Sequence, residues 1–188
     1  MYRQFSAADA ESILRTSEGA PTAYRGTGAP GHPGSRHLML SNAELLERYE
    51  RFSEQLIWRN GRLRHREFML VTAFCTLPEM IDAAVLVLNA AQTQAALTDF
   101  FQNTQRGPGM RAEIACRSDR PYTMRYAQGA TIVRTMPVLD LLMILDRVDE
   151  RPFGRQIQTF FGTLTDQSRN SATMFSADGQ ARHSHFVP

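Results

Sequence analysis

The hydrophobic pattern of this chain changes its period once, at Gly107-Pro108-Gly109. Before this point, apolar residues recur with the spacing of helices that bury one face. After it, short apolar and β-branched runs alternate with turn residues, which is typical of strands. Helices followed by successive strands predict an α+β fold, with N-terminal helices and then an antiparallel β-meander.

Three helices are expected before the change of period. Ser41 and Glu44 are spaced as a capping box, in which the serine hydroxyl accepts from the Glu44 amide while the glutamate reaches back. A helix over residues 41–52 follows from this signal. A second helix begins at Thr76, followed by a proline that the first turn tolerates. A third covers residues 93–102.

Strands are expected after the change of period, because turn signals such as Asp119-Arg120-Pro121 separate the apolar runs. The expected strands cover residues 111–116, 122–127, 131–134, 138–148 and 155–164. The last two of them should form a hairpin across residues 149–154.

The ends of the chain differ in composition from its middle. Residues 1–30 are rich in Gly, Pro, Ser, Thr and Ala, and predict a flexible linker or arm, with a short helix over residues 7–15 as the alternative for its first part. Residues 166–188 are polar, lack a clear pattern and predict a tail. The folded domain should therefore span residues 31–165, a length that suits one domain.

Several classes of protein are not supported by the sequence. No apolar run approaches the ~18 residues that span a bilayer, and the first ten residues lack the apolar segment of a secretory signal. No Cys/His cluster has the spacing of a zinc site. Cys75 and Cys116 are too few for a disulfide framework and are expected to be buried thiols. The chain should have no membrane span and should leave its cell, if at all, by secretion or translocation without the usual signal peptide.

The basic residues are all arginines, although the net charge is only +2. Six of them lie close together in the sequence, and these are Arg48, Arg51, Arg59, Arg62, Arg64 and Arg66. A guanidinium group matches phosphate with two parallel hydrogen bonds, so the stretch could hold an RNA backbone. A solvated basic loop is the simpler interpretation of the cluster taken alone.

Two histidines, His32 and His37, precede the capped helix, and Arg48 lies on the third turn of that helix. By spacing alone, an ordinary loop histidine and a surface arginine are the simplest interpretations. His37 reaches the Arg48 face only if the loop before the helix turns back.

The segment with Gly31, His32 and His37, followed by a serine-started helix with Leu45 and Arg48, resembles the N-terminal motif of the bacterial RNase A-like toxin domain. This domain occurs at the C-terminal ends of contact-dependent growth-inhibition proteins and related polymorphic toxins. Further segments that resemble the family, in the same order, are Thr72-Ala73-Phe74, Ala83, Ala84, Asn89, Phe100, Phe101, residues 138–145 and residues 158–162. The resemblance covers most of residues 31–165.

The resemblance implies an RNase A-like fold and a metal-independent endoribonuclease with His37, Arg48 and Thr159 as catalytic residues. His37 would take the proton of a ribose 2′-hydroxyl, which attacks the adjacent phosphorus and leaves a 2′,3′-cyclic phosphate. Histidine suits this role because its ordinary pKa lies near neutral pH. Arg48 would stabilise the negative charge on the phosphorus oxygens. No cofactor or metal is implied, because the nucleophile belongs to the substrate.

Other matching positions are accessory or depart from the family pattern. His32 is a second proton-transfer group or a brace for the loop, and bracing is the favoured interpretation. Thr72 matches the small hydroxyl residue before the second helix. Phe161 stands where the family has a tyrosine, and its ring can stack on a base but cannot donate a proton. Gly162 stands where the family has a proline, which is a milder departure.

The implied partners are an RNA substrate, with transfer RNA among the candidates, and a cognate immunity protein that docks at the cleft near Arg48. The implied place of action is the cytoplasm of a competing bacterial cell. Two alternatives remain: a catalytically impaired RNA-binding module of the same fold, favoured by Phe161, and an interaction partner such as an immunity or adaptor protein. An isoelectric point of about 8.8 speaks mildly against the last.

Overall fold

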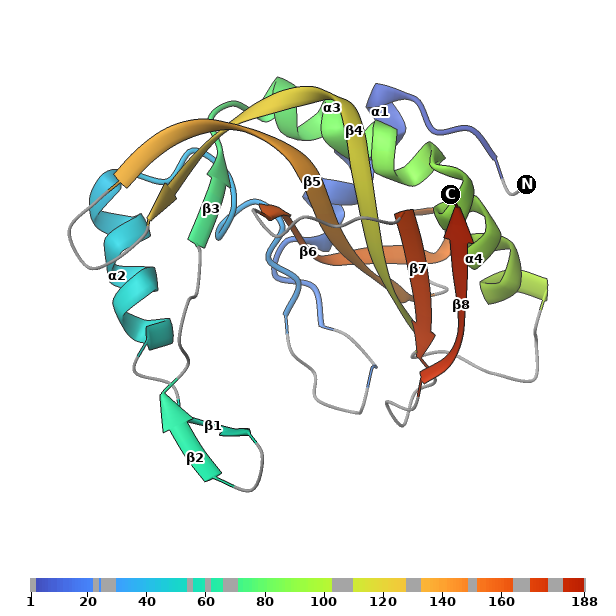
Figure 1. The fold of residues 1–188 in the computed structure, drawn as a ribbon. Helices are drawn as coiled ribbons and strands as arrows, with labels where there is room; N and C mark the ends of the chain where they lie inside the picture. Colours follow the sequence, from blue (N-terminus) through green and yellow to red (C-terminus); the bar gives the residue numbers. More distant parts are fainter. Residues whose placement is uncertain are drawn as a thin grey trace.

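The computed structural model describes residues 3–21, 24, 30–53, 56–59, 62–65, 71–102, 110–127, 133–148, 152–163, 170–175 and 181–187. Its helices are α1 (Ala7–Ser17), α2 (Asn42–Ser53), α3 (Leu77–Asn89), α4 (Ala91–Gln102) and a 3-10 turn, η3 (Pro152–Gly154). Its strands are β1 (Leu56–Arg59), β2 (Arg62–His65), β3 (Val71–Phe74), β4 (Arg111–Ala127), β5 (Val133–Arg147), β6 (Arg155–Thr163), β7 (Asn170–Phe175) and β8 (Ala181–Val187). Helices therefore precede most of an antiparallel sheet, and the predicted α+β class is confirmed (Figure 1).

A curled sheet forms the body of the protein (Figure 1). Its strand order is β6-β5-β4-β7-β8, and β3 also pairs with β4. One edge of β4 has two partners, because β7 pairs with residues 111–115 and β3 pairs with residues 124–127. The other edge of β4 pairs with β5. The long central strand thus joins two halves of the sheet, and β3 lies in the half near α2.

The predicted strands 111–116 and 122–127 are one strand, β4, and this prediction of two strands is wrong. The register between β4 and β5 shifts between Arg117 and Tyr122, so the presumed turn residues form an irregularity inside a continuous ladder. Pro121 lies in this irregularity, where a strand tolerates the missing amide. The expected strands 131–134 and 138–148 likewise merge into β5, although residues 131 and 132 lie outside the described residues. The expected last hairpin is confirmed as β5–β6.

Both ends of the chain differ from the predicted arm and tail. The hydroxyl of Ser6 accepts from the Asp9 amide and the Asp9 carboxylate accepts from the Ser6 amide, which caps α1. Ile13 of this helix is fully buried. At the other end, β7 alternates inward and outward positions, and its Ala172 and Met174 are fully buried. Both segments therefore bury apolar side chains and belong to the folded body of the protein.

Two clusters of buried side chains position the elements around the site. In the larger cluster, α1, α3 and α4 pack on the sheet, with the rings of Phe74 and Phe160 at 5.1 Å between centroids. The smaller cluster holds α2 against β3 through Leu45, Val71 and Ala73. Strand β3 belongs to both clusters, so it fixes α2 relative to β6.

None of the helices in the described ranges is, on its own, long and apolar enough to cross a membrane. Helices α3 and α4 meet that measure only as a pair, across a bend of 65°.

A separate two-stranded sheet, β1–β2, lies beyond the end of α2 and away from the main sheet (Figure 1). The sequence analysis identified this segment only as basic. Asn60-Gly61, between two short runs with strand-forming residues, is the signal that predicts such a hairpin, because this dipeptide suits a two-residue turn.

Candidate active site

The backbone of His37 is fixed at the end of β3. Its carbonyl accepts from the Phe74 amide at 2.8 Å, and the Phe74 carbonyl accepts from the Met39 amide at 2.9 Å. The amide of His37 donates to the Gly34 carbonyl at 3.1 Å, which closes the turn before it. The loop that carries both histidines therefore turns back onto the sheet before α2 begins.

The ring of His37 lies between β3 and β6. Its Nδ1 is 3.2 Å from the Thr72 carbonyl oxygen, and its Nε2 is 2.9 Å from Thr159 Oγ1. Because a carbonyl can only accept, Nδ1 carries the proton and Nε2 accepts from the Thr159 hydroxyl. The Thr72 hydroxyl donates to the Gly162 carbonyl at 2.8 Å, which ties the two strands together. The tautomer leaves a basic nitrogen on the β6 side.

Two further rings stand beside His37. The Phe161 ring is stacked on it at 5.2 Å between centroids and 24° between planes. The His32 ring is 6.1 Å away. The Nδ1 of His32 donates to the Pro30 carbonyl at 3.1 Å, and the His32 amide donates to the Gln158 carbonyl at 3.0 Å. His32 is thus held by both its ring and its backbone.

Positive charge is concentrated around these rings. Burial, and to a smaller extent the charge of the neighbouring Arg36, lower the pKa of Arg48 to about 10. Burial is also the main cause that lowers the pKa of His32, to which the charges of Arg36 and Arg48 add, while Glu18 acts in the opposite direction. Gathering cations in a half-buried place is unfavourable unless an anion binds among them.

The pKa of His37 falls to about 3. Burial is the largest cause, and the charge of Arg48 is the next, because both disfavour the protonated ring. His37 is only 7% exposed. Its imidazole is therefore neutral at pH 7, and the ordinary pKa assumed from the sequence does not apply to the protein without a bound anion.

We expect acid to destabilise the fold through His37. The unfolded chain binds a proton at this residue near pH 6.5, whereas the folded chain does so only near pH 3. The free energy of unfolding should therefore fall as the pH drops through this window, by on the order of 3 kcal/mol between pH 7 and pH 4. Urea denaturation at both pH values measures this loss, and His37→Asn should show correspondingly less of it. Equal losses in the two proteins would contradict the expectation.

The structure brings most of the predicted catalytic and accessory residues together. His37 contacts Thr72, Thr159 and Phe161, and His32 stands beside it. Arg48 is half-buried on α2 and interacts electrostatically with both histidines.

The predicted RNA-binding arginines lie elsewhere. Arg51 is exposed on the last turn of α2, and Arg59, Arg62 and Arg64 belong to the β1–β2 hairpin. Arg66 lies outside the described residues.

Two residues near the site were missed by the sequence analysis. Arg36 directly precedes His37, and its charge acts on both histidines and on Arg48. The Glu18 carboxylate accepts from the amides of Gly34 and Ser35 at 2.8 and 3.2 Å, so it holds the loop from α1. Adjacency to a histidine could have indicated Arg36, but no local signal indicates Glu18.

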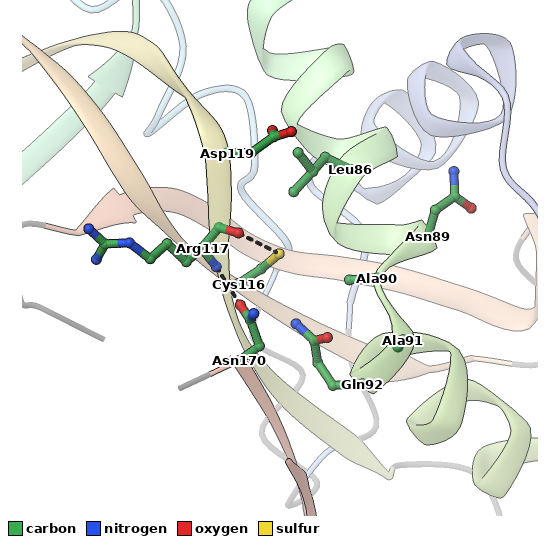
Figure 2. Close-up of a pocket in the computed structure, with 9 residues that line it drawn as sticks. All are labelled: Leu86, Asn89, Ala90, Ala91, Gln92, Cys116, Arg117, Asp119 and Asn170. Atoms are coloured by element: carbon green, nitrogen blue, oxygen red, sulfur yellow. Dashed lines mark hydrogen bonds between the residues drawn. The ribbon is translucent and has the colours of Figure 1, made fainter. Parts of the chain in front are cut away.

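An open pocket lies apart from these residues, where the α3–α4 junction faces β4 and β7 (Figure 2). Its described lining consists of Leu86, Asn89, Ala90, Ala91, Gln92, Cys116, Arg117, Asp119 and Asn170. Burial raises the pKa of the Cys116 thiol to about 11, and the Arg117 guanidinium pairs with Asp140. In the part of the chain that the structure describes, both cysteines are free and no group of three His, Cys, Asp or Glu could hold a metal ion.

Comparison with known proteins gives little further information. No family model matches the chain, and no curated protein matches it. Among solved structures, one chain of a CdiA-CT/CdiI complex from Y. kristensenii is similar, with a TM-score of 0.47 and 21% identity. The likeness covers 69% of this chain and 96% of that one. A likeness at this level carries no inference about function.

Proposed function

We propose that this protein is a metal-independent endoribonuclease that cleaves RNA by attack of the ribose 2′-hydroxyl. The observation that supports the proposal is the neutral His37 ring, whose Nδ1–H is bound to the Thr72 carbonyl. Its Nε2 meets a movable hydroxyl on Thr159, and Arg48 and Arg36 supply positive charge nearby. A correctly protonated base beside cations is what this reaction requires.

The proposed step begins when Nε2 of His37 takes the 2′-hydroxyl proton, after the Thr159 hydroxyl turns from this nitrogen to the substrate. The 2′-oxygen forms a bond to phosphorus, and the bond from phosphorus to the 5′-oxygen breaks. Arg48 stabilises the charge on the phosphorus oxygens. Phe161 has no proton to give, and the ring proton of His32 is held by Pro30, so solvent protonates the leaving oxygen. The products are a 2′,3′-cyclic phosphate and a 5′-hydroxyl.

The electrostatics of the site support an anionic substrate. A phosphate placed among Arg36, Arg48 and the histidines offsets the charges that lower the pKa of His37. Its pKa then rises toward the range in which a general base works well. Substrate binding thus strengthens the base that acts on it.

The test is an RNA cleavage assay in excess EDTA, with an oligonucleotide that carries one ribonucleotide in a DNA strand as a second substrate. We expect cleavage of RNA, cleavage of the mixed strand only after its ribonucleotide, and cyclic phosphate ends. An all-DNA strand should stay intact. Loss of all cleavage in EDTA, or cleavage of the all-DNA strand, would show that the proposal is wrong.

A second candidate function is RNA binding without turnover. Phe161 favours it, because its phenyl ring lacks the hydroxyl of the tyrosine that stands at this position in the family that the chain resembles. This candidate predicts that RNA is retained in EDTA and remains intact.

The resemblance to toxin domains further motivates the proposal that the chain acts as an RNase toxin in the cytoplasm of a competing bacterium. An immunity protein in the producing cell would then neutralise it. Carboxylates of that partner would meet the cations around Arg48.

A further inference from the structure

We propose that the β1–β2 hairpin is an arm that binds the phosphate backbone of RNA, through one of its two faces, outside the cleavage site. The choice of RNA as the ligand rests on the proposed function. The arm contributes affinity for long RNA and takes no part in the chemical step.

The register of the hairpin places its arginines on a common face. Arg59 is the ladder partner of Arg62, and Ile57 is the partner of Arg64. Partners directly opposite each other in an antiparallel ladder belong to the same face, and alternate positions of a strand share a face. The arginine-bearing face therefore consists of positions 57, 59, 62 and 64, and the opposite face consists of Leu56, Trp58, Leu63 and His65.

This arrangement is unfavourable without an anion. Like charges directly opposite each other destabilise a ladder, and Arg59 and Arg62 are such a pair. A two-stranded hairpin has little stability of its own, and this one is a sheet separate from the main sheet. A bound anion removes the repulsion, so the pairing itself points to an anionic ligand.

The spacing favours a polymer with regularly placed negative groups. Positions 62 and 64 are about 6.8 Å apart along the strand, which suits successive phosphates of one nucleic acid strand. Arginine presents a planar fork that binds phosphate with two hydrogen bonds.

The place of the hairpin favours RNA over an acidic protein. It continues from the end of α2, the helix that carries Arg48 in the candidate active site and the exposed Arg51 near its last turn (Figure 1). An RNA strand cleaved at His37 extends beyond the site on both sides, so a basic arm on this helix can meet it.

The experiment compares two triple variants in a His37→Ala background, which keeps the RNA uncleaved. In one, Arg59, Arg62 and Arg64 become Gln, and in the other they become Lys. Dissociation constants for a labelled single-stranded RNA are measured from 50 to 300 mM salt. The slope of log K against log salt should fall in magnitude by about 2 in the Gln variant, because three phosphate contacts are lost, and should stay unchanged in the Lys variant. The single variant Arg62→Gln should lower it by about 0.7.

An unchanged slope in the folded Gln variants, with circular dichroism matching the parent protein, would overturn the proposal. The proposal would also be overturned if the Gln variants lost affinity for polyglutamate but kept their affinity for RNA. Cleavage of a dinucleotide separates the two proposals, because His37-dependent cleavage should be equal with and without the hairpin arginines. A lowered slope in a protein that cleaves no RNA would support the arm and reject the ribonuclease.

Discussion

Replacement of His37 by alanine is expected to lower the rate of RNA cleavage by about 10² to 10⁴-fold, the usual contribution of a positioned general base. The reason is the fixed tautomer: the Thr72 carbonyl holds Nδ1–H, which leaves Nε2 as the nitrogen able to take the 2′-hydroxyl proton. Single-turnover cleavage of a labelled RNA at pH 7 measures the effect.

His37→Asn is the matched variant for this experiment. An asparagine amide can still donate to the Thr72 carbonyl, but it cannot accept a proton at neutral pH. It should therefore be as inactive as the alanine variant while unfolding at a similar temperature to the wild type. Wild-type activity in either variant would remove His37 from the mechanism.

Replacement of Arg48 by alanine is expected to lower kcat/KM by about 10² to 10³-fold, as when one donor to a developing oxyanion is removed. Arg48 is half-buried, so its charge acts in a medium that screens it less than water does. Arg48→Lys should recover part of the loss, because the charge is kept but the planar fork is not.

Arg15→Ala provides the control for Arg48. Arg15 is exposed on α1 and pairs with Glu11, an arrangement that contributes little to stability. This variant should keep wild-type activity. If Arg48→Ala also kept it, the charge at the site would have no part in cleavage.

Signals within a few residues of one another predicted the helices well. The Ser41–Glu44 capping box is present in both of its hydrogen bonds, and Thr76 caps α3. The strands were harder to delimit, because a turn signal such as Asp119-Arg120-Pro121 is also what an irregularity within a long strand looks like. Strand β4 pairs with β5 on both sides of that irregularity and is therefore continuous, which local sequence does not show.

The candidate site was named through a family resemblance and not through spacing. His37 and Thr159 are 122 residues apart, so no local pattern relates them. The lowered pKa of His37 was equally beyond the sequence, because its main cause is burial by elements from distant parts of the chain. Glu18 was missed for the same reason, whereas Arg36 directly precedes His37 and its adjacency could have indicated it.

The residues of the candidate site are spread along the chain from His37 to Thr159, and this determines when during synthesis the site can form. The proposed base is His37. Its tautomer is set by the Thr72 carbonyl of β3, and its hydroxyl partner, Thr159, belongs to β6. Gln156 of that strand also binds the Ala20 carbonyl, 136 residues away. Closing such long loops is slow, and a chain that still lacks β6 cannot form the contacts that compensate for the lost entropy. During synthesis the ribosome must therefore have released the chain at least through β6 before any chemistry that depends on the site can begin.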